Sequence, residues 1–271
     1  MPELPEVETT RRGIEPLITG KRVKQVIVRT DKLRWPIPGT LGRDLKNQYI
    51  DSVERRAKYI FLNTAAGSVI VHLGMTGSLR VIDSRTPVQK HEHIDVHLEN
   101  GQVLRYKDAR KFGAFLWTRQ DPHEHKLITR LGPEPLSNDF NADYLFTTTR
   151  KRKAAIKTHI MNQHVVVGIG NIYASEALFK AGINPNKAAH KVSKEKLNLL
   201  VKTSKQTLRA AIKQGGTTLQ DYQNADGAPG YFSIKLKVYG KQGLPCPECA
   251  KPITSRVIGQ RNSFYCTHCQ S

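Results

Sequence analysis

Long hydrophobic runs are missing from this sequence of 271 residues. No stretch of 18 or more apolar residues occurs, which excludes a membrane-spanning helix. The opening residues, MPELPEVETT, also lack the apolar core of a secretion signal. We therefore expect a soluble, intracellular protein in a reducing compartment.

Cysteine is scarce, and its placement is informative. The chain has 4 cysteines, and all belong to the pattern C-x2-C-x16-C-x2-C near the C-terminus. Four thiolates on two short knuckles can close a tetrahedral site for one structural Zn²⁺, which organises a fold and performs no chemistry. Two disulfides are the alternative, which a reducing compartment disfavours. The predicted ligands are Cys246, Cys249, Cys266 and Cys269.

Between these cysteine pairs, the stretch VIGQRNSFYC predicts a β-hairpin. Gly259 is expected at its turn, because glycine tolerates the backbone conformations of tight turns. Arg261 then lies at the tip of a rigid hairpin. An arginine held in this way suits contact with a phosphate, although a solvent-exposed arginine without a partner is the simpler alternative.

Acidic residues are few relative to basic ones. The chain has 43 Lys and Arg but 23 Asp and Glu, a net charge of +20. Residues 150–213 alone carry 14 basic and 2 acidic side chains. Such a surface favours a polyanionic partner, since binding phosphates releases their counterions. An acidic membrane is the competing partner, but the chain shows no basic amphipathic anchor or lipidation motif.

The distribution of patterns predicts an α+β protein of several domains without internal repeats. Residues 20–120 contain short, alternating β runs, and Asn100-Gly101 is a hairpin signal between two of them. This spacing predicts a sandwich or barrel. The segment LGPEPL (131–136) indicates a domain boundary, and helical patterns follow to residue 213. Residues 215–231 are rich in glycine and polar residues and predict a mobile loop.

The helical region contains VVVGIGNIYASEALFKAGINP (165–185). It lacks the third glycine of a dinucleotide fingerprint, so that interpretation is weak. We expect a helix–turn–helix instead, in which Gly168 and Gly170 form the turn and Asn171 caps the next helix. Exposed N–H groups there can hold a phosphate, with Lys157 adding charge. An ordinary helical hairpin is the alternative.

The N-terminus raises a separate question. A helix starting near Pro5 explains Pro5, Glu6 and Glu8, because proline suits a first helical turn and acidic residues suit the helix N-terminus. Helix formation does not explain Pro2.

Six motifs together resemble the bacterial formamidopyrimidine-DNA glycosylase family. In order they are PELPEVE, RRAKY (55–59), HLGMTGSLR (72–80), YKDARKFGAF (106–115), GIGNIYASE (168–176) and the four-cysteine tail. They span nearly the whole chain. The resemblance implies an N-terminal β-sandwich domain with flanking helices (1–132), a helix–two-turn–helix domain (133–233) and a zinc-finger hairpin (234–271).

The resemblance also implies a bifunctional glycosylase and abasic-site lyase of base excision repair. Its partner would be double-stranded DNA that contains oxidised purines, above all 8-oxoguanine, or abasic sites. Once the initiator Met is removed, Pro2 offers a secondary amine that is partly neutral near physiological pH. Attack on C1′ of the sugar gives an iminium ion, which permits elimination of the 3′- and then the 5′-phosphate. Glu3 is implied as general acid, Glu6 as a supporting carboxylate and Lys58 as an assisting cation.

Base removal requires the nucleotide to leave the helix, and other side chains must fill the hole. By resemblance, Met75, Arg110 and Phe112 fill it, with Arg110 bonding the opposite cytosine. Lys111 stands where the family commonly has Arg. His72 is implied to contact the DNA backbone, as are Lys157 and Asn171, and Arg261 to clamp a phosphate during elimination. The loop 217–226 matches the segment that closes over the flipped base.

Two alternatives remain open on the sequence alone. An endonuclease VIII-like enzyme would share the proline chemistry but prefer oxidised pyrimidines. A non-catalytic zinc-containing DNA-binding protein would keep the fold and would have no need for the Pro2-Glu3 pair.

Overall fold

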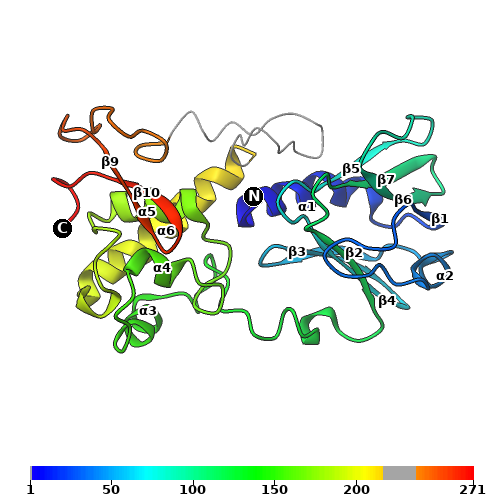
Figure 1. Ribbon diagram of the computed structural model, residues 1–271. Coiled ribbons are helices and arrows are strands. Elements are labelled where there is room, and N and C mark those ends of the chain that lie inside the picture. Colours follow the sequence, from blue (N-terminus) through cyan, green and yellow to red (C-terminus); the bar gives the residue numbers. More distant parts are fainter. Residues whose placement is uncertain (1, 216–235) are drawn as a thin grey trace. The chain divides into compact units, whose positions relative to one another are not determined.

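The computed structural model describes residues 2–215 and 236–271 (Figure 1). Those residues fall into two compact units. The first contains residues 2–129 with Gln214 and Gly215, and the second contains Arg130–Lys213 and 236–271. In this division the cysteine-rich tail groups with the helices, and the three domain limits inferred from the sequence stay a prediction. Within the described residues, no helix is both long and apolar enough to cross a lipid bilayer.

Two antiparallel four-stranded sheets form the first unit, with strand orders β1-β6-β7-β5 and β2-β3-β4-β8. One hydrophobic core contains side chains from both sheets, such as Ile94 and Val96 from one and Ile60 and Val71 from the other. Sharing one core makes the pair a β-sandwich, as predicted. The strands are β1 (Val23–Val28), β2 (Ser52–Arg56), β3 (Tyr59–Thr64), β4 (Gly67–His72), β5 (Ser78–Asp83), β6 (Glu92–Leu98), β7 (Gln102–Lys107) and β8 (Ala114–Thr118).

The Asn100-Gly101 signal is confirmed as a hairpin connection. Strands β6 and β7 pair antiparallel on either side of it. Gly101 has φ +80°, a conformation that glycine adopts without the steric cost of a Cβ.

Helix α1 (Leu4–Ile18) packs along the sandwich and contacts β2 and β5. Its apolar side chains Val7, Ile14 and Ile18 recur at helical spacing and are buried in the same core. Pro5 lies in the first turn, as predicted. Two short helices, α2 (Leu41–Leu45) and η1 (Pro122–Glu124), complete this unit within the described residues.

Helices dominate the second unit and enclose a core of their own. They are α3 (Ala142–Thr149), α4 (Ile156–Ile160), α5 (Asn171–Lys180), η2 (Ala189–Lys191) and α6 (Lys194–Lys213). The predicted turn holds at Gly168, which has φ +71°. The predicted cap is wrong by one position: Gly170 is the N-cap of α5, and Asn171 is its first helical residue. The Asn171 side chain is therefore free of capping and bonds elsewhere.

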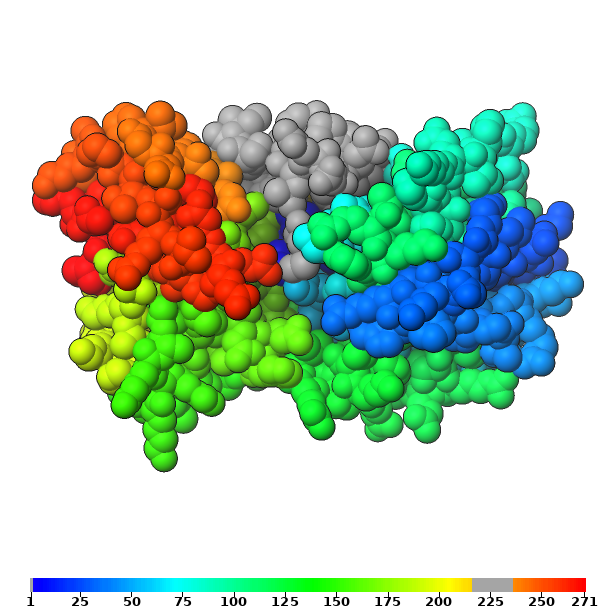
Figure 2. All heavy atoms as spheres, viewed as in Figure 1, coloured from blue at the N-terminus to red at the C-terminus, as the bar shows by residue number. Residues whose placement is uncertain are grey.

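The tail forms the predicted hairpin from β9 (Thr254–Ile258) and β10 (Arg261–Tyr265). Gly259 and Gln260 connect the strands with φ of +55° and +62°, as a type I′ turn requires. A Cβ on Gly259 would lie 2.7 Å from Thr158 Oγ1, so this turn rests on α4. Figure 2 shows the tail, in orange and red, packed against the green and yellow helices of the same unit.

A carboxylate anchors the start of this tail. Glu176 of α5 is buried and accepts backbone N–H bonds of 2.9 Å from Lys237, Val238 and Tyr239. The segment preceding it, which includes most of the predicted loop 215–231 and all of 217–226, lies outside the described residues.

Candidate active site and metal centre

Four of the five residues that were predicted to take part in the chemistry gather at the N-terminus of α1, and the fifth, Arg261, lies in the second unit. Pro2 is buried and directly precedes Glu3, the N-cap of the helix. The Glu3 N–H donates to Glu6 Oε2 at 2.9 Å. Lys58 Nζ lies 3.3 Å from Glu3 Oε2, and both side chains are largely buried. A nucleophile candidate thus stands next to a buried carboxylate–ammonium pair.

Burial raises the pKa of Glu3 above its ordinary value. Lys58 opposes this rise and Glu6 adds to it, because the first charge stabilises the carboxylate and the second repels it. A carboxyl with a raised pKa keeps its proton to higher pH. Glu3 is therefore suited to general acid catalysis.

The turn that carries Lys58 is held by a buried ion pair. Arg55 Nε donates to Glu8 Oε2 at 2.8 Å, and Arg55 Nη1 donates to the carbonyl of Ala57 at 2.9 Å. Ala57 itself has φ +55°, which costs energy for a residue with a side chain. Arg55 thereby connects α1 to the turn that places Lys58.

The role expected for Glu8 at the helix N-terminus is wrong. Glu8 lies beyond the first turn of α1, where the field of the N-terminal N–H groups fades. Burial alone would raise the pKa of Glu8, but hydrogen bonds from Arg11, Arg12 and Arg55 outweigh it and lower the pKa to about 2. The sequence does not indicate the contact with Arg55, which is 47 residues away, whereas Arg11 and Arg12 lie at the helical spacings i, i+3 and i, i+4 from Glu8.

His72, at the end of β4, packs its ring against Tyr59 with 4.8 Å between the ring centres. Burial, followed by the charges of Lys58 and Arg34, lowers the pKa of His72 to about 3. The ring is therefore neutral at physiological pH. Its Nδ1 accepts from the Gly74 N–H at 3.0 Å, which assigns the proton to Nε2 and makes that atom a donor.

Met75 lies on the loop between β4 and β5, and Arg110 and Phe112 lie on the loop between β7 and β8. Both Arg110 and Phe112 are exposed, and the guanidinium carbon sits 4.7 Å from the centre of the Phe112 ring. Lys111 donates to Thr30 Oγ1 at 2.9 Å. The substituted lysine thus has a structural contact in this unit.

The second unit brings Lys157 and Asn171 together with the hairpin. Lys157 Nζ donates to Asn171 Oδ1 at 2.5 Å and to Ser263 Oγ at 2.6 Å, and Asn171 Nδ2 donates to the carbonyl of Asn262 at 3.0 Å. Burial and the charge of Arg261 lower the pKa of Lys157 to about 8. Arg261 begins β10 directly after the turn and is exposed.

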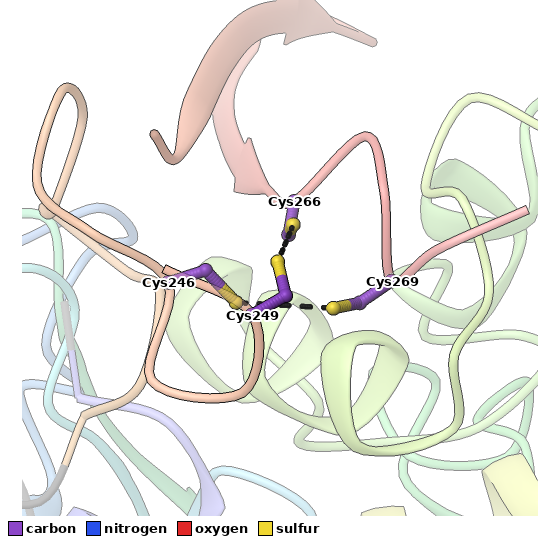
Figure 3. A group of neighbouring side chains, drawn as sticks. All are labelled: Cys246, Cys249, Cys266 and Cys269. Atoms are coloured by element: carbon purple, nitrogen blue, oxygen red, sulfur yellow. Dashed lines mark hydrogen bonds between the residues drawn. The ribbon is translucent and has the colours of Figure 1, made fainter. Parts of the chain in front are cut away.

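Four sulfur atoms converge between the two knuckles of the tail (Figure 3). All lie within 4.8 Å of one another, with 3.9 Å between Cys246 and Cys269 and 3.5 Å between Cys249 and Cys266. Four thiolates around one tetrahedral Zn²⁺, with Zn–S bonds near 2.3 Å, place their sulfurs ~3.8 Å apart. The four cysteines therefore fit one structural zinc ion, as predicted, and leave no open coordination position.

Three known protein domain families match most of the chain. Residues 1–115 match the formamidopyrimidine-DNA glycosylase N-terminal domain, residues 131–223 the H2TH domain of the same enzymes, and residues 243–271 the zinc finger found in FPG and IleRS. The chain belongs to the formamidopyrimidine-DNA glycosylase family. The resemblance inferred from six short motifs is thus confirmed.

Individual relatives agree along their full length. The formamidopyrimidine-DNA glycosylase of Thioalkalivibrio sulfidiphilus is 54% identical over 270 residues, which cover 100% of both chains. Two solved structures of the Lactococcus lactis protein each cover 100% of both chains at 31% identity. One is a complex with DNA containing an abasic site, with a TM-score of 0.92, and the other contains N7-benzyl-Fapy-dG DNA, with a TM-score of 0.91.

Proposed function

We propose that this family member is a bifunctional DNA glycosylase and abasic-site lyase that removes oxidised purines from duplex DNA in base excision repair. The observation that carries the proposal is the position of Pro2 beside the buried Glu3–Lys58 pair. Solved relatives bound to Fapy-dG and abasic DNA support the same substrate class. The protein would act as a monomer in the cytoplasm, on the nucleoid.

The reaction begins when the Pro2 amine, freed by removal of the initiator Met, attacks C1′ of the damaged nucleotide. Glu3 donates its proton to the sugar-ring oxygen, the ring opens, and the base departs with the electrons of its C1′–N bond. Pro2 loses its N–H proton, the departing base takes up a proton, and the nitrogen of Pro2 is now part of an iminium ion. Lys58, which contacts Glu3, supplies a positive charge that stabilises the carboxylate left after proton transfer. Glu6 holds the Glu3 backbone in place.

The iminium ion then acts as an electron sink. Loss of a proton from C2′ expels the 3′-phosphate, and a second elimination expels the 5′-phosphate. Water finally releases Pro2 from the sugar fragment. Glu3 can carry protons in these steps because its burial favours the carboxyl that donates, whereas the charge of Lys58 favours the carboxylate that accepts. In the proposal, Arg261 clamps a phosphate during elimination.

The remaining residues hold the DNA open. Met75, Arg110 and Phe112 fill the space left by the flipped nucleotide, while neutral His72 donates from Nε2 to the backbone. In the second unit Asn171 and Arg261 contact phosphates, and Lys157 adds positive charge beneath them. The zinc ion keeps the hairpin of Arg261 folded.

The two alternatives fit less well. An endonuclease VIII-like specificity is disfavoured by a full-length match to glycosylases named for formamidopyrimidines. A non-catalytic DNA-binding protein does not need a carboxyl with a raised pKa beside an N-terminal proline.

Single-turnover excision tests the proposal. The substrates are duplexes with 8-oxoguanine opposite C, 8-oxoguanine opposite A, and an oxidised pyrimidine. Cytosine offers two adjacent acceptors to Arg110 and adenine does not, so excision opposite C should be roughly ten- to a hundredfold faster than opposite A. Arg110→Ala should remove most of this difference, whereas Arg43→Ala, at an exposed site on α2, should not. Faster excision of the pyrimidine would overturn the purine assignment.

A further inference from the structure

A buried aspartate, Asp108, is bonded to both loops that carry Met75, Arg110 and Phe112. These three residues were predicted to fill the space left by the flipped nucleotide. Asp108 follows β7 at the start of the loop that carries Arg110 and Phe112, and its exposed fraction is 0%. Its Oδ1 accepts from Thr76 Oγ1 at 2.8 Å and from the Arg110 N–H at 3.2 Å. Its Oδ2 accepts from the Gly113 N–H at 2.8 Å and from the Tyr106 hydroxyl at 3.3 Å.

The backbone of Asp108 is bonded as completely as its side chain. Its N–H donates to the carbonyl of His91 at 3.0 Å, and its carbonyl accepts from His93 Nε2 at 2.9 Å. Asp108 is therefore fixed by β6 and the segment before it. A group held so firmly can set the position of the loops that bond to it.

The loop between β4 and β5 carries Met75, and the loop between β7 and β8 carries Phe112. Strands β5 to β7 separate the two loops in the sequence, but their backbones touch. A Cβ on Gly74 would lie 2.5 Å from the Gly113 nitrogen and 2.6 Å from the Phe112 carbonyl carbon. Such distances leave no room for a side chain, so the loop of Met75 and the loop of Phe112 are in direct contact. The carboxylate of Asp108 adds a bond to each, through Thr76 and Gly113.

We propose that Asp108 is a positioning residue that joins the Met75 loop and the Arg110–Phe112 loop into one rigid element. This element would enter the DNA as a unit, and its rigidity would fix the Arg110 guanidinium against the opposite base. The inference rests on the proposed function, since it concerns how accurately Met75, Arg110 and Phe112 are placed in the space left by the flipped nucleotide. Asp108 itself touches neither the DNA nor the reacting atoms.

Replacement by asparagine is an exacting test because the shape is kept. Each carboxylate oxygen faces one backbone N–H, from Arg110 and from Gly113, and these donors cannot turn away. An asparagine has one carbonyl oxygen and one NH₂ group. Whichever way it is oriented, its NH₂ group faces a backbone N–H. Either the buried Gly113 N–H loses its acceptor, or the Arg110 N–H keeps only its longer bond of 3.3 Å to Thr76 Oγ1.

The experiment compares full-length wild type, Asp108→Asn and Thr76→Val on two substrates. The first is duplex 8-oxoguanine opposite C or A, which needs the void to be filled. The second is a single-stranded abasic site, which has no opposite base and needs only the Pro2 chemistry. Asp83→Asn, an exposed aspartate at the end of β5, is the matched control.

For Asp108→Asn we expect excision opposite C to fall at least about tenfold, and the preference for C over A to shrink by a similar factor, since a bidentate base contact provides about that discrimination. Elimination at the single-stranded abasic site should change less than about twofold. Thr76→Val removes the bond to Asp108 Oδ1 and the bond of 3.3 Å from the Arg110 N–H, but keeps the carboxylate, and should shift both duplex quantities in the same direction by less. Asp83→Asn should match wild type.

Three results would overturn the inference: equal losses on both substrates, an unchanged preference for C over A in both variants, or a loss in Asp83→Asn of the same size. If Asp108→Asn does not fold, as judged by its thermal unfolding, Thr76→Val decides by the same criteria. If wild type itself fails on an abasic site in both single-stranded and duplex DNA, the proposed lyase function is wrong, which is a separate outcome.

Discussion

Burial shifts the pKa of two residues in the candidate site, Glu3 and His72. The pKa of Glu3 rises and that of His72 falls, so that burial favours the uncharged form of both. Glu3 is pushed toward its neutral, protonated form, and His72 toward its neutral, unprotonated form. Lys58 acts on both pKa values: its charge opposes the rise in the pKa of Glu3 and contributes to the fall in the pKa of His72. One ammonium group thus tunes both an acid and a hydrogen-bond donor.

The depressed pKa of His72 predicts a pH dependence of stability. Unfolded histidine binds a proton below pH about 6.5, whereas folded His72 does so only near pH 3. The unfolded state therefore gains the proton first. The stability that His72 contributes is complete above the unfolded pKa and is lost as pH falls toward the folded pKa, by up to about 1.4 kcal/mol per pH unit.

Equilibrium unfolding of full-length protein between pH 7 and pH 4 measures this effect. His72→Asn can still accept the Gly74 N–H but cannot titrate, so its stability should decline less steeply than that of wild type. His123→Asn, at an exposed position, should follow wild type. Parallel curves for wild type and His72→Asn would show that His72 is not held neutral.

Among the elements, the tail combines the metal centre with the hairpin that presents Arg261. Its small apolar core includes Phe179 of α5 with Cys246, Ile253 and Cys266, so the metal ligands are themselves part of the packing. Lys157 and Asn171 bond the opposite side of β10. The hairpin that presents Arg261 is held by zinc at one end and by helices α4 and α5 along its length.

Removing the metal, or making Cys249→Ser, should therefore unfold the hairpin, because metal binding and local folding are coupled. DNA affinity should fall roughly ten- to a hundredfold, the range expected for losing a charged hydrogen bond. Fluorescence anisotropy with a lesion duplex measures the affinity, and restoring zinc should recover it only in wild type. Full affinity without metal would mean that Arg261 is not an important phosphate contact.

The sequence predicted elements well where the signal was local. Asn100-Gly101 and Gly259 indicated turns because a tight hairpin turn needs positive φ angles, which favour glycine and asparagine at those positions. The four cysteines marked the metal centre because their spacing is itself the ligand geometry.

Contacts between distant residues were beyond such reasoning. Thr76 and Asp108 are 32 positions apart, and Glu8 and Arg55 are 47 apart, so no periodicity joins them. The cap of α5 was misplaced for a related reason. Asn171 has the right side chain for capping, but its amide is claimed by Lys157 and the hairpin, and Gly170 takes the cap position.

On the scale of the whole molecule, the excess of basic charge is concentrated in residues 150–213. This segment carries Lys157 and Asn171, and Arg261 lies on the hairpin that bonds to them. The proposed DNA contacts of the second unit therefore coincide with the most basic part of the chain. Its contribution to affinity should be largely electrostatic.

The salt dependence of binding to undamaged duplex tests this view. The logarithm of affinity should fall linearly with the logarithm of salt concentration, by about 0.9 for each phosphate contacted. At pH 7, Arg261→Gln should reduce that slope by about 1. Arg256→Gln, an exposed arginine on the same hairpin, is the control and should leave the slope unchanged. Equal reductions in the two variants would contradict a specific clamp at Arg261.

The central claim is that Pro2 forms the covalent intermediate, and mapping the trapped adduct tests it most directly. Borohydride reduces an iminium ion to a stable amine, so full-length protein incubated with 8-oxoguanine duplex and borohydride should become linked to DNA. After digestion, mass spectrometry should place the sugar fragment on the peptide that begins with Pro2. A protein that retains its initiator Met, and the Pro2→Gly variant, should trap at least about tenfold less at unchanged DNA affinity, because neither offers the secondary amine. An adduct on Lys58, or undiminished trapping in both altered proteins, would contradict the account.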